Sequence, residues 1–210
     1  MEKLIHISDL EITLEGMLKI PENCSGIVVF AHGSGSSRFS PRNNFVSNIL
    51  NEAGFGTLLI DLLSPEEDEI YQTRFDIDLL AKRLGKVVDW LKKQSETKAF
   101  SLGLFGSSTG AAAALIVAAS FSKDIKAVVS RGGRPDLALP SLEKVKAPTL
   151  FIVGGKDFQV IELNQVAYER LECLKDFKII PNATHLFEEK GCLEQVAILA
   201  KDWFEKYFKS

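Results

Sequence analysis

Residues 100–120 read FSLGLFGSSTGAAAALIVAAS. Phe100–Phe105 is a short apolar run typical of a buried strand, and the alanine-rich segment Ser108–Ser120 is typical of a helix. Between them, residues 106–110 match the pattern G-x-S-x-G, with Ser108 at its centre. In this pattern a sharp turn joins a strand to a helix and holds the serine hydroxyl above the sheet, while the flanking glycines let the two elements approach closely. The stretch therefore predicts a strand–turn–helix unit with Ser108 as a candidate nucleophile.

Strand and helix patterns alternate along nearly the whole chain. Apart from the strand above, the predicted strands are Leu4–Ile7, Ile12–Ile20, Gly26–Ala31, Thr57–Ile60, Ile125–Ser130, Pro148–Val153 and Phe177–Ile180. Apart from the helix above, the predicted helices are Arg42–Ala53, Phe75–Lys93, Ile161–Leu174 and Leu193–Phe208. The acidic stretch Pro65–Glu69 is expected to be a surface loop.

This alternation predicts the class of fold. Strands joined by helices form right-handed βαβ crossovers, which give a mainly parallel sheet with helices on both faces. The first two predicted strands are expected to pair antiparallel at the edge of that sheet. We therefore predict an α/β fold, a three-layer α/β/α sandwich with an antiparallel N-terminal edge, as a single domain over residues 1–210. In such sheets, ligands bind beyond the carboxyl ends of the strands.

The composition argues against several classes of protein. Lys and Arg total 25 against 28 Asp and Glu, so the net charge of −3 lacks the basic excess of a nucleic-acid-binding protein. Cys24, Cys173 and Cys192 are far apart and form no CxxC pair, which argues against a disulfide framework and a cysteine-rich zinc site. The sequence has no metal-binding or nucleotide-binding motif, so we expect no cofactor.

The hydropathy pattern bears on location. The apolar segment Ala111–Ala119 is much shorter than a membrane span, and the first nine residues lack the apolar region of a signal peptide. We expect a cytoplasmic monomer or homodimer without a nucleic-acid or membrane partner.

A serine hydroxyl becomes a nucleophile only beside a base, and the base needs an acid to orient it. Asp157 follows the predicted strand Pro148–Val153, and His185 follows the predicted strand Phe177–Ile180. Because the carboxyl ends of parallel strands meet at one edge, Ser108, Asp157 and His185 can converge there. The alternatives are an incidental serine in a glycine-rich turn, a helix N-cap at Asp157 and a solvent-exposed loop histidine at His185.

Ester cleavage also needs hydrogen-bond donors for the oxyanion of the tetrahedral intermediate. The backbone N–H of Thr109 lies at a predicted helix N-terminus, where the helix dipole favours negative charge. The second expected donor is the backbone N–H of Ser34, in the loop HGSGSS at residues 32–37. His32 is expected to brace this turn by hydrogen bonds rather than to act as a second base.

These motifs resemble the α/β-hydrolase superfamily, and specifically its small, lid-less, dienelactone-hydrolase-like branch. The resemblance covers nearly the whole chain and rests on HGSGSS at residues 32–37, GSSTG at 106–110, GGKD at 154–157 and THLF at 184–187. It implies a Ser108–Asp157–His185 triad that hydrolyses an ester, lactone or thioester. Dienelactone hydrolases proper use a cysteine nucleophile, so Ser108 departs from their pattern and speaks against dienelactone as the substrate.

Four arginines are expected in loops that border this edge: Arg38, Arg42, Arg131 and Arg134. They can bind a carboxylate or phosphate of a small acyl substrate. The alternative is that they pair with loop acids such as Asp61 and Asp136. Residues 131–145 are too few for a cap domain, so we expect an open, shallow site for a small soluble acyl compound.

The sequence leaves three classes of function. The first is a serine hydrolase of the carboxylic ester type. The second is a peptidase or amidase with the same triad, which sequence alone does not separate from an esterase. The third is a binding module that keeps the fold without turnover, because a fold does not imply a function. Three chemically matched groups at three separate strand ends favour an enzyme over a binding module.

Overall fold

The computed structural model describes residues 1–9 and 12–208. Its strands are β1 (Glu2–Asp9), β2 (Ile12–Lys19), β3 (Ile27–Ala31), β4 (Gly56–Ile60), β5 (Leu102–Ser107), β6 (Ile125–Arg131), β7 (Thr149–Gly154) and β8 (Lys175–Ile180). Its helices are α1 (Pro41–Glu52), α2 (Pro65–Asp68), α3 (Tyr71–Arg74), α4 (Ile77–Lys93), α5 (Thr109–Ser120), α6 (Phe158–Arg170), α7 (Cys192–Phe208) and the 3₁₀ helix η1 (Pro135–Lys144).

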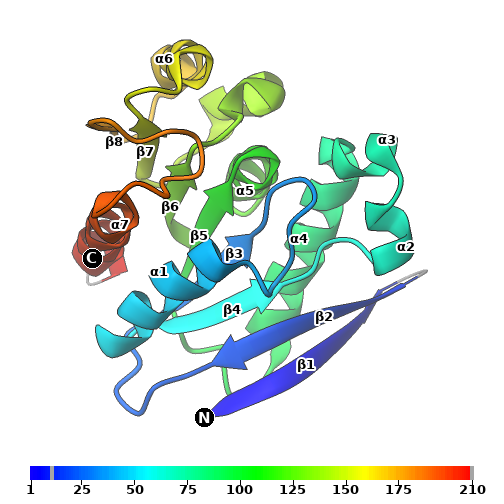
Figure 1. Ribbon diagram of the computed structural model, residues 1–210. Coiled ribbons are helices and arrows are strands. Elements are labelled where there is room, and N and C mark those ends of the chain that lie inside the picture. The colour runs from blue at the N-terminus through cyan, green and yellow to red at the C-terminus, as the bar shows by residue number, and fades with distance from the viewer. Residues whose placement is uncertain (10–11, 209–210) are drawn as a thin grey trace.

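The described strands form an eight-stranded sheet in the order β1-β2-β4-β3-β5-β6-β7-β8 (Figure 1). From β4 to β8 the neighbours pair in parallel, whereas β2 pairs antiparallel with both β1 and β4. The predicted α/β class, the mainly parallel sheet and the antiparallel N-terminal edge are confirmed.

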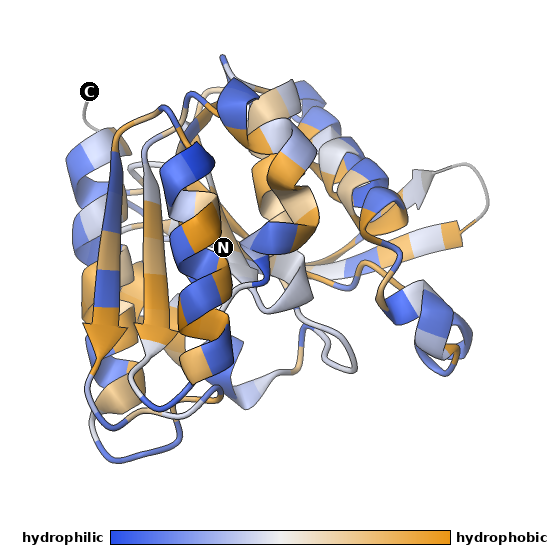
Figure 2. Cartoon of the chain, turned by 90° about the horizontal axis from the view of Figure 1, so that it is seen from above, coloured by the Kyte–Doolittle hydropathy of each residue, from blue (hydrophilic) through white to orange (hydrophobic). Residues whose placement is uncertain are grey.

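Apolar side chains of the sheet pack on both of its faces. In β3, Val28 and Phe30 belong to a cluster with residues of α1 and α7, while Ile27 and Val29 belong to a cluster with residues of α4, α5, α6 and η1. This alternation follows from the two-residue period of a strand. Figure 2 shows hydrophilic and hydrophobic residues side by side along the covering helices, as expected where one helix face meets a sheet.

Most predicted boundaries differ from the observed ones by no more than two residues, and two predictions were wrong by more than that. Pro65–Glu69 is not a loop, because α2 forms one helical turn there: Ser64 and Glu67 make a reciprocal capping box, and Pro65 stands at the start of the helix. The predicted helix Ile161–Leu174 instead spans Phe158–Arg170. The residues after this helix lead directly into β8. Leu174, just before β8, accepts a hydrogen bond from the N–H of Thr149 in β7.

The order of the strands identifies the edge where a ligand is expected. The chain leaves β3 for β4 on one side and then returns to form β5 on the other side, so the crossovers diverge at β3. Ligands of open α/β sheets bind in the crevice beyond the carboxyl ends of strands at such a point. The described part of the chain contains no helix with both the length and the apolar composition needed to cross a membrane.

Candidate active site

Ser108 occupies a strained turn between β5 and α5. Its φ of 50° and ψ of −123° lie in a region that non-glycine residues rarely adopt. Its half-buried side chain makes no capping hydrogen bond among the described residues. Strained backbone of this kind concentrates at functional sites, because the surrounding structure must hold it in place.

Close packing on both sides holds the turn. A methyl group on Gly106 would lie 2.4 Å from Ala111 Cα, and one on Gly110 would lie 2.2 Å from Ala31 O, so both positions require glycine. A methyl group on Gly33 would lie 2.9 Å from Ser108 Cβ. The turn after β3 therefore lies directly against the candidate nucleophile.

The neighbouring serine has a different role. Ser107 is buried, and its hydroxyl donates to Asn43 Oδ1 at 3.1 Å. Asn43 is a buried residue in the first turn of α1, so this bond ties the helix to the end of β5. Sequence reasoning did not identify Asn43, because its partner lies 64 positions away.

Asp157 and His185 are in direct contact. His185 Nδ1 lies 2.6 Å from Asp157 Oδ2. A carboxylate only accepts, so the proton of a neutral ring is on Nδ1 and Nε2 has a free lone pair. Asp157 does stand at the N-cap position of α6, but among the described residues its side chain makes no capping bond. The carboxylate is thus used on the histidine rather than on the helix.

The loop that carries His185 is itself strained. In the described part of the chain the non-glycine residues with positive φ are Ser108, Asn182 (φ 65°) and Phe187 (φ 58°), and the last two flank His185. Phe187 is buried at 1% exposure, and the N–H of Lys156 donates to Ala183 O at 2.9 Å. Sequence reasoning missed Phe187, because positive φ at a phenylalanine has no sequence signal.

Residues 131 and 132 connect the Ser108 turn to the ring of His185. Its N–H donates to Arg131 O at 3.3 Å, and a methyl group on Gly132, the next residue, would lie 3.5 Å from His185 Cε1. The described residues include no hydrogen bond between the Ser108 hydroxyl and the His185 ring. In unliganded enzymes such bonds often form only when substrate is bound.

The loop after β3 places the expected oxyanion donor, the Ser34 N–H, in contact with Thr109, the residue after Ser108. The Ser34 N–H donates to Thr109 Oγ1 at 3.0 Å, so in this structure it is bonded to a side chain. His32 is buried: its Nε2 accepts from the Leu62 N–H at 3.0 Å and its Nδ1 lies 2.9 Å from Gly33 O. Both ring nitrogens are occupied, which is the bracing arrangement expected for this histidine.

Two of the four arginines are paired with the acids that the alternative interpretation named. The guanidinium of Arg38 contacts Asp61 and donates to Glu15 Oε2 at 2.8 Å. Arg134 makes two bonds to Asp136, at 2.9 and 2.8 Å, and these bonds raise the pKa of Arg134.

The expectation of a loop position was wrong for the other two arginines, because Arg42 lies in the helix that was predicted to begin there and β6 extends one residue further than predicted, over Arg131. Arg42 is the second residue of α1, and Arg131 is the last residue of β6. Arg42 Nη1 donates to Glu188 Oε1 at 2.8 Å. Arg131 is only 8% exposed, and burial together with the nearby charge of Arg42 lowers its pKa to about 10.

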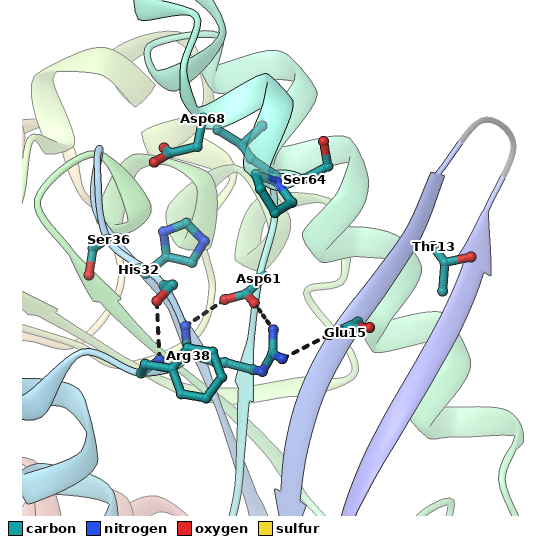
Figure 3. A pocket seen from close by; sticks show the side chains of 12 residues that line it. Thr13, Glu15, His32, Ser36, Arg38, Asp61, Ser64 and Asp68 are labelled. Carbon is teal, nitrogen blue, oxygen red and sulfur yellow. Dashed lines mark hydrogen bonds and ion pairs between the residues drawn. The ribbon is translucent and has the colours of Figure 1, made fainter.

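A cavity of about 470 Å³ is lined in part by His32 (Figure 3). Its lining, as far as the chain is described, contains none of the three candidate catalytic residues: Thr13, Glu15, His32, Ser36, Ser37, Arg38, Phe39, Asp61, Leu63, Ser64, Pro65 and Asp68. Figure 3 shows the Arg38 guanidinium between Asp61 and Glu15. The turn after β3 contributes His32, Ser36 and Ser37 to this cavity, and its Gly33 packs against Ser108.

Two of the cysteines are poorly suited to act as nucleophiles. Burial raises the pKa of the Cys24 and Cys173 thiols, which disfavours the reactive thiolate. No group of three or more His, Cys, Asp or Glu side chains in the described ranges could hold a metal ion.

Known proteins resemble this chain over most of its length. It is similar to a solved dienelactone hydrolase from Anabaena variabilis, with 53% identity, a TM-score of 0.95, and coverage of 99% of this chain and 98% of that one. It shares its fold with Est1E from Butyrivibrio proteoclasticus, solved with ferulic acid bound, at 18% identity, a TM-score of 0.82, and coverage of 98% and 100%.

Curated relatives from Mycobacterium tuberculosis, provisionally named phosphoribosyl transferases, are 56% identical over 193 residues, which are 92% of this chain and 44% of theirs. The chain thus spans less than half the length of those relatives. The family model described as the dienelactone hydrolase family matches residues 14–208. The chain belongs to the dienelactone hydrolase family.

Proposed function

We propose that the protein is a serine hydrolase that cleaves a carboxylic ester, lactone or thioester of a small substrate through an acyl-enzyme on Ser108. The observation that carries this proposal is the strained Ser108 turn beside an imidazole that is 2.6 Å from a carboxylate. An unstrained glycine-rich turn would need neither the positive φ of Ser108 nor the His185–Asp157 contact.

The first half-reaction forms the acyl-enzyme. Ser108 Oγ attacks the carbonyl carbon of the substrate while His185 Nε2 takes the hydroxyl proton. Asp157 stabilises the imidazolium that forms. The tetrahedral intermediate then collapses, His185 gives its proton to the leaving alcohol or thiol, and the acyl group remains on Ser108.

The oxyanion of the intermediate needs two donors. The N–H of Thr109 is at the N-terminus of α5, where the helix dipole favours negative charge. The Ser34 N–H, now bonded to Thr109 Oγ1, becomes available when the threonine hydroxyl rotates away. In the second half-reaction His185 takes a proton from water as the water oxygen attacks the acyl carbon. The intermediate then collapses, the bond to Ser108 Oγ breaks, and His185 returns the proton to Ser108 Oγ as the acid is released.

The transferase name of the mycobacterial relatives belongs to proteins more than twice as long as the matched segment. The matched segment is 44% of those proteins, and it is also the segment that the hydrolase family model covers here. The hydrolase chemistry is proposed for this segment alone.

Labelling with a fluorophosphonate probe tests the proposal, because the probe reacts with activated serine hydroxyls. The native protein and Ser107→Ala are expected to be labelled, whereas Ser108→Ala is not. Ser107→Ala is the matched control, since it removes the adjacent, buried hydroxyl. Labelling of Ser108→Ala at the native rate, or no labelling of the native protein, would overturn the assignment of the nucleophile.

Hydrolysis of p-nitrophenyl acyl esters, thioesters and anilides then separates the reaction classes. Ester or thioester turnover that disappears in Ser108→Ala supports the proposal. Anilide turnover of equal efficiency would favour the amidase alternative, and labelling without turnover of any substrate would contradict the proposed reaction.

A further inference from the structure

Arg131 is a buried cation without a hydrogen-bond partner for much of its guanidinium. Its Nε and Nη1 are inaccessible to solvent and have no partner among the described residues. The residue is 8% exposed. Burying a charge costs several kcal/mol unless hydrogen bonds or an opposite charge compensate for it. Arg131 therefore has bonding capacity that the described protein does not use.

Arg131 and Arg42 both contact the segment that follows His185, Arg131 at Phe187 and Arg42 at Glu188. Burial and the like charge of Arg42 lower the pKa of Arg131, and Arg42 Nε is also buried without a partner in the described ranges. Arg131 forms no ion pair with a carboxylate among the described residues, and its aromatic neighbour is Phe187, whose ring centre is 6.0 Å from the guanidinium carbon. Two like charges in a low-dielectric region repel each other, so the pair favours an added anion.

Glu188 is the exposed residue paired with Arg42. Its carboxylate accepts from Arg42 Nη1 at 2.8 Å. The side chain of Glu188 is 64% exposed and that of Arg42 is 29% exposed, whereas Arg131 as a whole residue is 8% exposed. An anion therefore approaches from the Glu188 side. The single negative charge of Glu188 neutralises one guanidinium and leaves the other uncompensated.

The pair lies next to the reacting serine. The Arg131 carbonyl accepts the Ser108 N–H, and Phe187, against the Arg131 guanidinium, is two residues beyond His185. A group bound by Arg131 and Arg42 can therefore belong to a molecule whose carbonyl lies at Ser108.

We propose that Arg131 and Arg42 form a subsite for a phosphate group of the substrate, which enters by displacing Glu188 from Arg42. This deepens the proposed function and rests on it for the link to hydrolysis. A phosphate monoester carries close to two negative charges and three acceptor oxygens at neutral pH, which matches two guanidinium groups with free N–H donors. A carboxylate, like that of Glu188, supplies one charge and would leave the other guanidinium unpaired.

Thermal unfolding with inorganic phosphate tests the binding without using turnover. At a hundredfold excess over Kd, phosphate is expected to raise the Tm of the native protein and of Ser108→Ala by about 5 °C, relative to sodium chloride of equal ionic strength. Arg131→Met is expected to lose this rise while Arg170→Met, a matched change at an exposed arginine of α6, keeps it. Glu188→Gln is expected to tighten phosphate binding about fivefold, because it removes the competing carboxylate.

The same variants distinguish a ligand site from a structural role. Without phosphate, Arg131→Met is expected to be at least as stable as the native protein, since it removes an uncompensated buried cation. A lower Tm of Arg131→Met without phosphate, together with no phosphate response of the native protein, would show that Arg131 is structural and would overturn the proposal. Arg131→Lys keeps the charge but not the planar fork, and it is expected to bind phosphate at least tenfold more weakly, an effect of about 1.4 kcal/mol.

Turnover of three matched p-nitrophenyl esters, neutral, carboxylate-bearing and phosphonate-bearing, identifies the substrate group. The native protein is expected to prefer the phosphonate ester in kcat/KM, and Arg131→Met is expected to lose about 10- to 100-fold on that ester alone. Equal preference for the carboxylate ester would overturn the phosphate assignment. A phosphate-dependent Tm rise in a protein that hydrolyses none of the esters would leave the subsite in place and refute the proposed hydrolase reaction instead.

Discussion

Asp61 and Asp157 are two aspartates of equal exposure with different partners. Each follows a strand at the carboxyl edge of the sheet, and each side chain is 16% exposed. Asp61 contacts the guanidinium of Arg38 and accepts the Arg38 N–H at 2.5 Å, whereas Asp157 faces the imidazole of His185 at 2.6 Å.

The difference between the partners predicts a difference in role. The guanidinium of Arg38 is permanently charged, so the charge state of its pair with Asp61 does not change, and the pair stabilises the loop after β3. The imidazole of His185 gains and loses a proton, so Asp157 can stabilise a charge that exists only during a reaction. Asparagine substitutions at the two positions should therefore separate catalysis from stability.

The largest expected effect is that of Asp157→Asn on turnover. We expect kcat/KM for a p-nitrophenyl ester to fall about 10³- to 10⁴-fold, because the amide favours the wrong imidazole tautomer. The Tm should change little, since the substitution is nearly isosteric. Steady-state kinetics and thermal unfolding of the same preparation test this, and near-native turnover would show that Asp157 is only a helix-terminal residue.

Asp61→Asn should have the opposite profile. It leaves the partly buried Arg38 with only the exposed Glu15 as counter-ion, so we expect the free energy of unfolding to drop by about 2–3 kcal/mol. Turnover of a neutral ester should stay within about threefold of native. Urea denaturation measures the loss, and Glu15→Gln, at a 42% exposed carboxylate, is the control with about 1 kcal/mol or less. A large loss of turnover with full stability would remove the distinction between the two aspartates.

The double substitution Asp61→Asn with Arg38→Met sharpens the test at a smaller scale. Removing both partners of a buried pair avoids the unpaired charge, so the double variant should regain stability to within about 1 kcal/mol of native. A double-mutant cycle of unfolding free energies measures this. Additive losses would mean that Arg38 and Asp61 do not act as a pair.

The smallest effect concerns a third carboxylate, Glu67. Hydrogen bonds from Arg83, at 2.7 Å to each oxygen, lower the pKa of Glu67 in the folded protein below its ordinary value of 4.5. The bond therefore stabilises the fold fully above that value, and the stabilisation is lost as the pH falls through the lowered pKa. Glu67→Gln should abolish this dependence.

Because the Glu67 side chain is 26% exposed, the gap between native and Glu67→Gln unfolding free energies should be about 1 kcal/mol at neutral pH and should shrink towards zero on acidification. Denaturation at several values between about pH 3 and 7 measures it. A gap that does not change with pH would mean that the charge of Glu67 contributes nothing.

Local patterns predicted most of the fold and the members of the candidate site. The two-residue period of the strands and the G-x-S-x-G turn located β5, α5 and Ser108. The sequence Ser-Pro-Glu-Glu at residues 64–67 also carries the capping-box signal of Ser64 and Glu67, which marks the start of α2. Asp61 and Asp136, the partners of Arg38 and Arg134, were among the acids considered from the sequence. The surroundings of Arg42 and Arg131 had no such signal, because they depend on which segments meet in space.

The sequence by itself determined the order of strands and helices and the residue types at the ends of the strands, because periodicity and turn chemistry act between neighbours along the chain. Only the tertiary structure decided that Asp157 contacts His185 rather than capping α6, that Arg38 is paired, and that Arg131 is buried beside another cation. Electrostatic pairing and desolvation act through space and depend on burial, which no local pattern specifies. For that reason Arg38 and Arg131, which are equivalent as residue types, have opposite surroundings in the folded protein.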